Sequence, residues 1–498
     1  LGDKTKLATF RAPNTIYYPF GCNASQKKAV ENALTNQVSI IQGPPGTGKT
    51  QTILNIIANL LLAKKSVLVV SNNNSAVDNV AEKLEGEGLG FLVAKLGSVE
   101  NKELFIANQK EYPQMDNWRI EDTSSIKQQV KQALRDVSLG FEGQSKFALL
   151  KTELDALHKE TKYDQMHHDV ADEHKWLFDK HSKKLMSFRL QYGILTEKGQ
   201  KFSLLQILKW SFALGLKVHK FLKAKPEAII NVLETAYYVS RKREIENELC
   251  TIETSLKTID IQQRVKELRQ LSLKALKNTI AKRFTGERRI FTIKTIKPQT
   301  EAFLKEYPVV LSTTYSAKAC ISKDMVFDYV IMDEASQVDI KTGALALSCA
   351  MNVVIVGDDK QLPNVVSREE EQALNAIQST YHVDEKYQAT ANSFLQSCVK
   401  VFTDAPVTLL REHYRCHPRI IDFCNQRFYN GELIAMTSDN NEDKHMYEAM
   451  ASAICEDIVC IVEVDNDKKI YNVRKSNEYF DKMLKKEGTL RELYCSMF

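Results

Sequence analysis

The sequence contains ten cysteines but lacks any pair with the spacing Cys-x-x-Cys. Zinc ribbons and thioredoxin-type redox sites use that spacing, so neither class of site is indicated. Five histidines lie between residues 158 and 181 without a frame of cysteines or carboxylates, and we predict no metal site there. We expect free thiols in a reduced setting, which predicts a cytoplasmic protein rather than a secreted one.

The sequence also lacks an uninterrupted apolar run long enough to cross a bilayer. The most apolar stretch, residues 204–222, is broken by Lys209, Lys217 and Lys220, so we predict no transmembrane helix and no membrane partner. The chain begins at Leu1 with neither a methionine nor a signal-peptide pattern. We therefore expect it to be a fragment of a longer protein.

Strong charge of one sign is absent as well. The formal net charge is +5 over 498 residues, which is too mild to indicate a polyanionic partner by itself. Hydrophobic residues make up 43% of the chain and charged residues 26%, which are ordinary proportions for a globular protein. The length predicts about three domains, each able to bury a core.

One stretch carries a strong signal for nucleotide binding. It follows the phosphate-loop pattern of Gly, four residues and Gly-Lys-Thr, and it consists of Gly43, Pro44, Pro45, Gly46, Thr47, Gly48, Lys49 and Thr50. The apolar run 38–42 predicts a strand before the loop, and apolar spacing over 51–62 predicts a helix after it. A phosphate loop requires this strand-to-helix setting, which disfavours the alternative of a glycine-rich loop without a ligand.

The residue types of the loop predict how it would hold a nucleoside triphosphate. Gly46 and Gly48 allow positive φ, which turns several N–H groups towards one point at the helix N-terminus. Lys49 would reach the β- and γ-phosphates, and the hydroxyl of Thr50 would hold Mg²⁺. The loop and Gln51 after it therefore form the predicted ATP site.

A glutamine precedes the phosphate loop at the start of another predicted helix. Asn23 or Ser25 is placed to cap this helix, with Gln26 in its first turn. A Gln side chain can bind bidentately to an adenine edge, which would select ATP over GTP. Such a residue taken alone is usually part of a solvated cap, but its position ahead of the phosphate loop favours the adenine role.

Four further apolar runs end in polar residues. Residues 66–71, 309–316, 327–332 and 353–356 are predicted to form or contain buried strands, and open α/β sheets bind ligands at the carboxyl ends of their strands. Asp333 would hold Mg²⁺ through water, Glu334 would orient and deprotonate the attacking water, and Gln361 would sense the γ-phosphate. A polar turn or an Asp-Glu pair taken alone is often only solvated surface.

Between about residues 101 and 308 the alternation of predicted strands and helices ends. Apolar residues recur at three- and four-residue steps over 126–157 and 249–259, which predicts an antiparallel helical hairpin with a packed tip near residues 202–222. The apolar stripes are far more often core than a ligand-binding surface. For the basic groups at 241–243, 282–283 and 288–289, a solvated helix face is favoured over contact with phosphates.

Taken together, these motifs resemble those of the superfamily 1B helicases, the Upf/Nam-like group that includes the nonsense-mediated-decay RNA helicase and its bacterial relatives. The resemblance implies two RecA-like motor domains and favours a bacterial origin. Matching segments follow in the family's order: residues 23–26, 43–50, 71–80, 311–314, 333–337 and 357–363, and then residues 410–433, which resemble the motif that opens the second motor domain.

The resemblance also implies roles for further residues. In the family, the Tyr and Arg of the last motif pack on adenine and act as an arginine finger, and these roles would fall to Tyr414 and Arg415. The insertion in the first motor domain guides single-stranded nucleic acid, and movement runs 5′ to 3′. Contacts to the strand are implied for Ser71, Asn72, Asn74, Val77, Thr313 and Thr314.

Two later family motifs, V and VI, are not recognised in the sequence. Residues 446–455 predict a helix, 458–464 and 469–473 a β-hairpin, and another helix follows; this part faintly resembles the opening of a PAS-type sensor domain. A fusion, an assembly junction or a divergent continuation would each explain it. We therefore predict a first motor domain over 1–100 and 309–400, an insertion over 101–308, the start of a truncated second motor domain over 401–443 and an atypical α/β tail over 444–498.

The sequence thus predicts an α/β phosphate-loop NTPase with a RecA-like parallel sheet and a long helical insertion. Its expected function is that of an ATP-dependent helicase or translocase on single-stranded DNA or RNA, with poor turnover in this chain because motifs V and VI are missing. The alternative is a nucleotide-gated module that binds nucleic acid, or a protein through the helical hairpin, without unwinding. A purely structural coiled-coil protein would leave Lys49, Asp333 and Glu334 unexplained.

Overall fold

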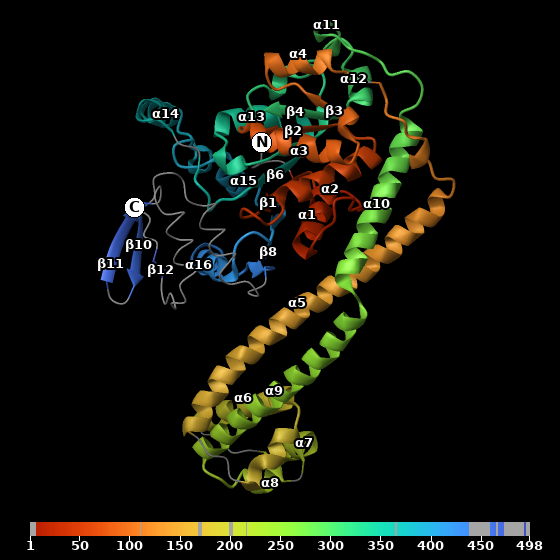
Figure 1. The fold of residues 1–498 in the computed structure, drawn as a ribbon. Helices are drawn as coiled ribbons and strands as arrows, with labels where there is room; N and C mark the ends of the chain where they lie inside the picture. Colours follow the sequence, from red (N-terminus) through yellow and green to blue (C-terminus); the bar gives the residue numbers. More distant parts are fainter. Residues whose placement is uncertain are drawn as a thin grey trace. The chain divides into compact units, whose positions relative to one another are not determined.

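The computed structural model of the protein describes residues 6–109, 111–167, 172–198, 203–215, 217–363, 366–437, 459–464, 467–472 and 493–494 (Figure 1). The chain divides into two compact units. Unit 1 comprises residues 1–12, 25–113 and 286–498, and unit 2 comprises residues 13–24 and 114–285. Each unit has a hydrophobic core of its own.

Unit 1 is built on a seven-stranded parallel sheet with the strand order β3-β4-β2-β5-β6-β1-β7. The strands are β1 (Val38–Gln42), β2 (Val67–Ser71), β3 (Val93–Lys95), β4 (Val309–Thr313), β5 (Phe327–Met332), β6 (Ala350–Gly357) and β7 (Val407–Leu409). The strands predicted from apolar runs are confirmed as β1, β2, β4, β5 and β6. Because all the pairs are parallel, their carboxyl ends meet at one edge of the sheet.

Both faces of this sheet are buried, which explains why its strands are almost continuously apolar. Neighbours along β1, such as Ile40 and Ile41, point to opposite faces, and both are fully buried. On one face, Ile40 shares a core cluster with Phe303 and Leu395, which come from helices after the insertion. The strands before and after the insertion therefore share one hydrophobic core, although the insertion separates them in the sequence.

Most helices of unit 1 lie around the sheet in Figure 1, whereas α14 (Arg368–Thr380) lies to one side. The others are α1 (Ala24–Thr35), α2 (Lys49–Leu62), α3 (Asn74–Gly86), α4 (Val99–Ala107), α11 (Ile293–Ile296), α12 (Thr300–Glu306), α13 (Ile340–Leu347), α15 (Phe394–Val401) and α16 (Pro418–Phe428). The phosphate-loop residues join β1 directly to α2, as the sequence predicts. Gln26 lies in the first turn of α1, also as predicted.

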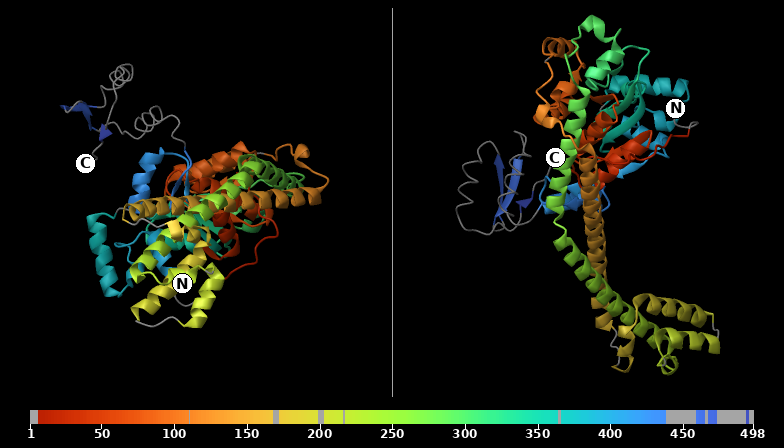
Figure 2. Two further views of the ribbon diagram at one scale, coloured as in Figure 1. Left: turned by 90° about the horizontal axis from the view of Figure 1, so that it is seen from below. Right: turned by 90° about the vertical axis from the view of Figure 1, so that its right-hand side faces the viewer.

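Unit 2 is the predicted helical hairpin. One long helix, α5 (Thr123–His167), runs out, and α9 (Pro226–Thr258) and α10 (Ile261–Arg283) run back. α5 lies beside α9 and α10 in all the views of Figures 1 and 2. Leu150, Leu157 and Ile245 form a small buried cluster between the arms, and an ion pair from Arg241 to both carboxylate oxygens of Glu153 ties them together.

The far end of the hairpin contains three shorter helices, α6 (Ser182–Glu197), α7 (Leu204–Leu214) and α8 (Val218–Phe221). They pack against the start of α9 around the rings of Phe188, Tyr192, Trp210 and Phe221. Phe188 and Trp210 meet edge to face with ring centroids 4.6 Å apart. This is the packed tip that the sequence predicts.

One basic residue departs from the predicted solvated face. Arg288 is only 9% exposed, and its guanidinium lies 4.2 Å from the ring centre of Tyr307 and 5.3 Å from that of Tyr112. It also donates to the carbonyl oxygen of Phe91. The prediction is wrong for this residue because cation–π contacts and a backbone acceptor compensate for its burial.

The carboxyl-terminal part contains strands β8 (Glu412–His413), β9 (Ile434–Ala435), β10 (Val459–Val464), β11 (Asp467–Asn472) and β12 (Leu493–Tyr494). β10 and β11 pair in antiparallel fashion, which confirms the predicted hairpin; the helices predicted on either side of it lie outside the described residues. None of the helices in the described part of the chain has the length and apolar character needed to cross a bilayer.

Candidate active site

The phosphate loop has the backbone geometry that its glycines predict. Gly46 has φ +87° and Gly48 has φ +84°, so the prediction of positive φ at both positions is confirmed. The N–H of Gly43 donates to the carbonyl of Gly357 over 2.9 Å, and the hydroxyl of Thr47 donates to the carbonyl of Pro44 over 2.7 Å. The first bond attaches the loop to the end of β6, and the second stabilises the turn within the loop.

The two glycines are also required by close packing. A Cβ on Gly46 would lie 2.5 Å from Cβ of Arg415, and a Cβ on Gly48 would collide with the side-chain amide of Gln26. Gly48 caps α2 without a side-chain hydrogen bond. The first turn of α2 thus presents its N–H groups and partial positive charge next to the loop, an arrangement that suits a polyphosphate.

Gln26 supports the loop from α1. Its side chain is 1% exposed, and its amide nitrogen donates to the carbonyl of Thr47 over 3.1 Å and to the side chain of Gln51 over 3.2 Å. This position excludes the solvated cap considered from the sequence. The adenine contact of Gln26 stays a prediction. In the structure, its hydrogen bonds support the phosphate loop.

Lys49 and Glu334 meet at the carboxyl edge of the sheet. Nζ of Lys49 lies 3.2 Å from Oε1 of Glu334, and the two side chains are 10% and 23% exposed. Glu334 has φ +52°, an uncommon conformation for a residue with a Cβ, and such strain concentrates at functional sites. Its second carboxylate oxygen is buried, and no group in the described part of the chain forms a hydrogen bond with it. The carboxylate therefore keeps an unused acceptor beside Lys49.

The neighbouring carboxylate, Asp333, is almost completely buried. Burial, followed by the negative charge of Glu334, raises the pKa of Asp333 to about 6, although Lys49 acts in the opposite direction. Two carboxylates in a desolvated site favour a bound cation, because a cation would relieve both the burial penalty and the repulsion. Asp333 and the hydroxyl of Thr50, in the first turn of α2, offer the oxygen ligands that Mg²⁺ prefers.

Gln361 is held by Asp358, for which no role was predicted. Its side-chain amide donates to Oδ2 of Asp358 over 3.1 Å, and the hydroxyl of Tyr429 donates to the same oxygen over 2.8 Å. Asp358 is 1% exposed. Burial, and then this hydrogen bond, raise the pKa of Tyr429, which keeps the hydroxyl protonated as a donor. Asp358 thus connects the predicted γ-phosphate sensor to the segment around α16.

The segment that carries Tyr414 and Arg415 crosses the phosphate loop. The N–H of Tyr414 donates to the carbonyl of Gly46 over 3.0 Å, and the ring of Tyr414 is half exposed. His413, which sequence reasoning missed, is buried below them; its Nδ1 accepts from the N–H groups of Arg415 and Cys416, each over 3.4 Å. Burial lowers the pKa of His413, opposed by a hydrogen bond with the Pro45 backbone. A neutral imidazole therefore joins the two segments.

A second link joins this segment to α1. Ser25 donates from its hydroxyl to a carboxylate oxygen of Glu412 and accepts from the N–H of Arg411 over 3.1 Å. Glu412 is 8% exposed. Sequence reasoning missed this pair; the only local signal was an acidic residue beside the Tyr-Arg motif. The pair fixes the start of the motif against the helix that carries Gln26.

The six residues implied to contact nucleic acid lie at and just after the ends of β2 and β4, and two of them, Asn74 and Val77, belong to α3. Ser71, Val77 and Thr314 are buried, whereas Asn72 and Asn74 are exposed and Thr313 is partly exposed. The amide of Asn72 donates to the carbonyl of Gln337 over 2.9 Å, and its oxygen accepts from Thr314. Asn72 therefore ties together three strand ends, and the exposed members of the group are Asn72 and Asn74, with Thr313 partly so.

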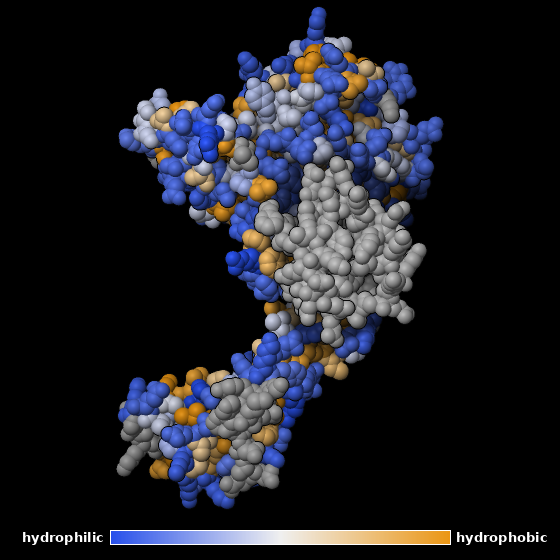
Figure 3. Space-filling model, turned by 60° about the vertical axis from the view of Figure 1, so that its left-hand side comes forward, coloured by the Kyte–Doolittle hydropathy of each residue, from blue (hydrophilic) through white to orange (hydrophobic). Residues whose placement is uncertain are grey.

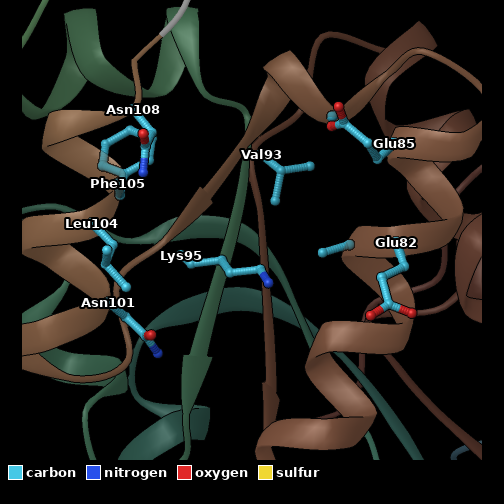
Figure 4. Close-up of a pocket in the computed structure, with 10 residues that line it drawn as sticks. Glu82, Glu85, Val93, Lys95, Asn101, Leu104, Phe105 and Asn108 are labelled. Carbon is cyan, nitrogen blue, oxygen red and sulfur yellow. The ribbon is translucent and has the colours of Figure 1, made fainter.

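A cavity of about 420 Å³ lies beside the edge strand β3 (Figure 4). Glu82 and Glu85 line it from α3, Leu104 and Phe105 line it from α4, and Lys95 crosses it from β3. None of its lining residues belongs to the predicted nucleotide site. The cavity is therefore separate from the cluster around Lys49.

Two family models match the chain, and both are described as an AAA domain. The first matches residues 21–369 and the second matches residues 390–486. The first match alone covers more than half of the chain and includes the phosphate loop, the helical insertion and the ends of β5 and β6. The second includes Tyr414 and Arg415 and continues through most of the residues where the sequence changes character.

The chain is similar to several helicases. The uncharacterized ATP-dependent helicase MG140 of Mycoplasma genitalium is 25% identical over 84% of this chain and 46% of its own length. Helicase sen1 of Schizosaccharomyces pombe is 25% identical over 82% of this chain and 20% of its own. The DNA polymerase alpha-associated DNA helicase A of the same yeast is 46% identical over 15% and 11%. The chain thus spans less than half the length of each of these relatives.

Proposed function

The chain belongs to the superfamily 1B helicases with AAA domains, and from this premise we propose that it binds Mg-ATP and couples ATP hydrolysis to movement along single-stranded DNA or RNA. The observation that carries the proposal is the approach of Lys49 to Glu334 over 3.2 Å beside the buried Asp333. These residues lie more than 280 positions apart in the sequence. A phosphate-binding cation and two carboxylates are the groups that phosphoryl transfer needs.

In this proposal the phosphates lie on the loop from Gly43 to Thr50, next to Gln51, with Lys49 against the β- and γ-phosphates. Gln26 and the half-exposed ring of Tyr414 bind adenine. Thr50 and Asp333 would hold Mg²⁺, which would neutralise charge on the phosphates. The raised pKa of Asp333 supports this assignment, because a carboxylate in such a site gains most from a cation.

Glu334 is the proposed general base. Its unpartnered carboxylate oxygen is available to accept a proton from a water molecule and to orient it towards the γ-phosphate. Gln361 contacts the γ-phosphate, and Arg415 stabilises the charge that develops on it. Arg415 is exposed and follows a residue whose N–H is bonded to the loop, so closure of the second motor segment would bring it to the phosphates.

For the nucleic-acid track we propose the ends of β2 and β4, where Asn72, Asn74 and Thr313 are accessible. Ser71, Val77 and Thr314, which are buried, would shape this edge from below. The names of the relatives include DNA and RNA helicases, so the proposal covers both kinds of strand. We further propose a cytoplasmic protein, which the seven free cysteines described in the structure support, and a protein partner on the helical hairpin.

The proposal is tested by steady-state ATP hydrolysis with and without single-stranded DNA or RNA. We expect strand-stimulated turnover that is lost in Lys49→Ala, and a loss of at least about 10²-fold in Glu334→Gln with ATP affinity retained, because the Gln cannot accept the proton. Because motifs V and VI are not recognised in the sequence, we expect slow turnover relative to binding. Lys65→Ala is the control, since Lys65 forms an exposed ion pair with Asp328.

Two results would contradict the proposal. Equal ATP binding by the wild type and by Lys49→Ala would show that the phosphate loop is not the nucleotide site. Salt-dependent binding of single strands that does not respond to ATP would favour a binding module without translocation.

A further inference from the structure

Helix α7 at the tip of the hairpin is apolar on two opposite sides. At about 100° per residue, Trp210 and Leu214 fall on one side, and both are buried in the core of the tip. Leu204, Leu205, Leu208 and Phe212 fall within an arc of about 100° on the other side. An apolar arc of this width is typical of a helix face that packs against other protein.

We call the second group the outward stripe, defined as Leu204, Leu205, Leu208 and Phe212. These side chains are 80%, 80%, 65% and 97% exposed. Single exposed apolar residues are common on protein surfaces, but four on one side of one helix are a continuous patch. The space-filling view shows hydrophobic residues at the surface of this end of the hairpin (Figure 3).

The rest of α7 is firmly held. Ser203 and Gln206 form a reciprocal capping box at its start, and Nε1 of Trp210 donates to the side chain of Gln191 over 3.0 Å. The inward residues pack on Phe188. The orientation of the outward stripe therefore follows from an anchored helix.

The stripe belongs to a basic part of the sequence. Between residues 174 and 235 the sequence has twelve Lys and Arg but only four Asp and Glu. Lys209, next to the stripe on the helix, is exposed. A second copy of this tip would bring like charges together, which disfavours self-association at low salt. Complementary charge favours an acidic partner.

We propose that the outward stripe is a docking surface for an acidic amphipathic helix of a partner protein. The stripe is about 12 Å long from Leu204 to Phe212 and one helix face wide, which suits a helix that lies alongside α7. Its apolar residues would fill the stripe, and its acidic residues would face the lysines around it. A nucleic-acid strand suits it less, because three of the four stripe residues are leucines, which supply no surface for base stacking.

The experiment uses the whole chain and a fluorescent synthetic peptide of about five helical turns, with leucine at every third and fourth position and glutamate at the others. A second peptide has lysine in place of glutamate. We expect the acidic peptide to bind and the basic peptide to bind at least about tenfold more weakly in fluorescence anisotropy. Binding of the acidic peptide should weaken as salt rises from about 0.05 to about 0.5 M, because exposed charges are screened.

Two variants and a matched control locate the surface. Leu208→Gln with Phe212→Ser should weaken binding of the acidic peptide at least about tenfold, and Lys209→Glu should weaken it several-fold. Leu149→Gln should leave it unchanged, because Leu149 is an equally exposed leucine on α5, 73% exposed, away from the stripe. Circular dichroism should show the same melting transition for all of these variants.

Three results would overturn the proposal. The first is binding of the acidic peptide that does not change in the Leu208 and Phe212 variant. The second is stripe-dependent binding to vesicles of anionic lipid without binding of the peptide, which would assign the surface to a bilayer. The third is stripe-dependent self-association in analytical ultracentrifugation, which would assign it to a second copy. None of these readouts depends on ATP hydrolysis, so the proposal stands or falls separately from the helicase function.

Discussion

Helices α2 and α7 are both rich in apolar residues but have opposite surroundings. Both are short, with 14 and 11 residues, and both are mostly apolar. α2 lies against the sheet and buries ten consecutive residues from Thr52 to Leu61, whereas α7 buries only Trp210 and Leu214. A helix that is apolar all round is normally covered; α2 is covered by its own domain, and we propose that α7 is covered by a partner.

The two N-termini differ in the same way. α7 satisfies its first N–H groups with its own Ser203 and Gln206, as a structural helix does. α2 begins after Gly48, which makes no side-chain cap bond, and its first residue is Lys49. Its N-terminus thus has no side-chain cap, which leaves it open for the phosphate proposed there, whereas that of α7 is capped by its own residues.

The largest expected effect is on the free energy of unfolding when a core residue of α2 is replaced. Ile56 of α2 is fully buried, so Ile56→Ala should lower the free energy of unfolding by about 2 to 5 kcal/mol through lost burial and a cavity. Denaturant unfolding of unit 1, followed by ATP-analogue fluorescence, measures the change. A loss below about 1 kcal/mol would show that α2 is packed as loosely as the outward side of α7.

Burial of the ionised Asp333 carboxylate lowers the stability of the folded chain at neutral pH. Its pKa is raised to about 6 by burial and by Glu334, so the folded chain binds the proton more tightly than the unfolded chain does. This contribution to stability is present at low pH and is lost as pH rises through 6. Asp333→Asn should therefore raise the free energy of unfolding at pH 7.5 by about 2 to 3 kcal/mol, with a gain that shrinks towards pH 4.

Thermal unfolding of wild type and Asp333→Asn without nucleotide, at pH 4, 6 and 7.5, measures this gain. ATP turnover by the same variant should be lost, since the amide cannot replace a carboxylate beside a cation. A gain that is equal at all three pH values would contradict the raised pKa.

The N-terminal contrast is tested by Gly48→Ala and Ser203→Ala. Gly48 has positive φ and packs on Gln26, so an alanine there should weaken ATP binding about tenfold or more. Ser203→Ala removes a cap, and we expect a cost of about 1 kcal/mol in the stability of the tip with ATP affinity unchanged. Isothermal titration with ATP measures the first effect, and hydrogen exchange at α7 measures the second. Equal ATP affinities in both variants would contradict the proposed difference between the N-termini of α2 and α7.

The smallest effect is expected on the outward side of α7. Phe212 is 97% exposed, and Phe212→Ser should change the free energy of unfolding by less than about 0.5 kcal/mol. Denaturant unfolding followed by circular dichroism measures this change. A loss comparable with that of Ile56→Ala would mean that the phenylalanine is covered within the chain, and the partner proposal would lose its main support.

Much of the fold follows from local patterns. The strands of the sheet, the phosphate loop with its two positive φ values, and the arms of the hairpin are confirmed because each is encoded by residues close together in the sequence. Arg288 shows where such reasoning failed: its charge predicted a solvated face, but three aromatic rings distant in the sequence surround it. Burial of a charged residue depends on partners that no short window of sequence contains.

The sequence by itself determined the chemistry that is available: a loop with Lys49, carboxylates at the end of a strand, and an apolar helix at a basic tip. Only the tertiary structure decided which groups meet. The parallel order of the strands brings Glu334 to Lys49. His413, through a hydrogen bond with the Pro45 backbone, and Glu412, through Ser25, attach the Tyr-Arg motif to the phosphate loop and α1. Residue type and spacing act over a few positions, whereas these distances depend on how strands 300 residues apart come to lie in one sheet.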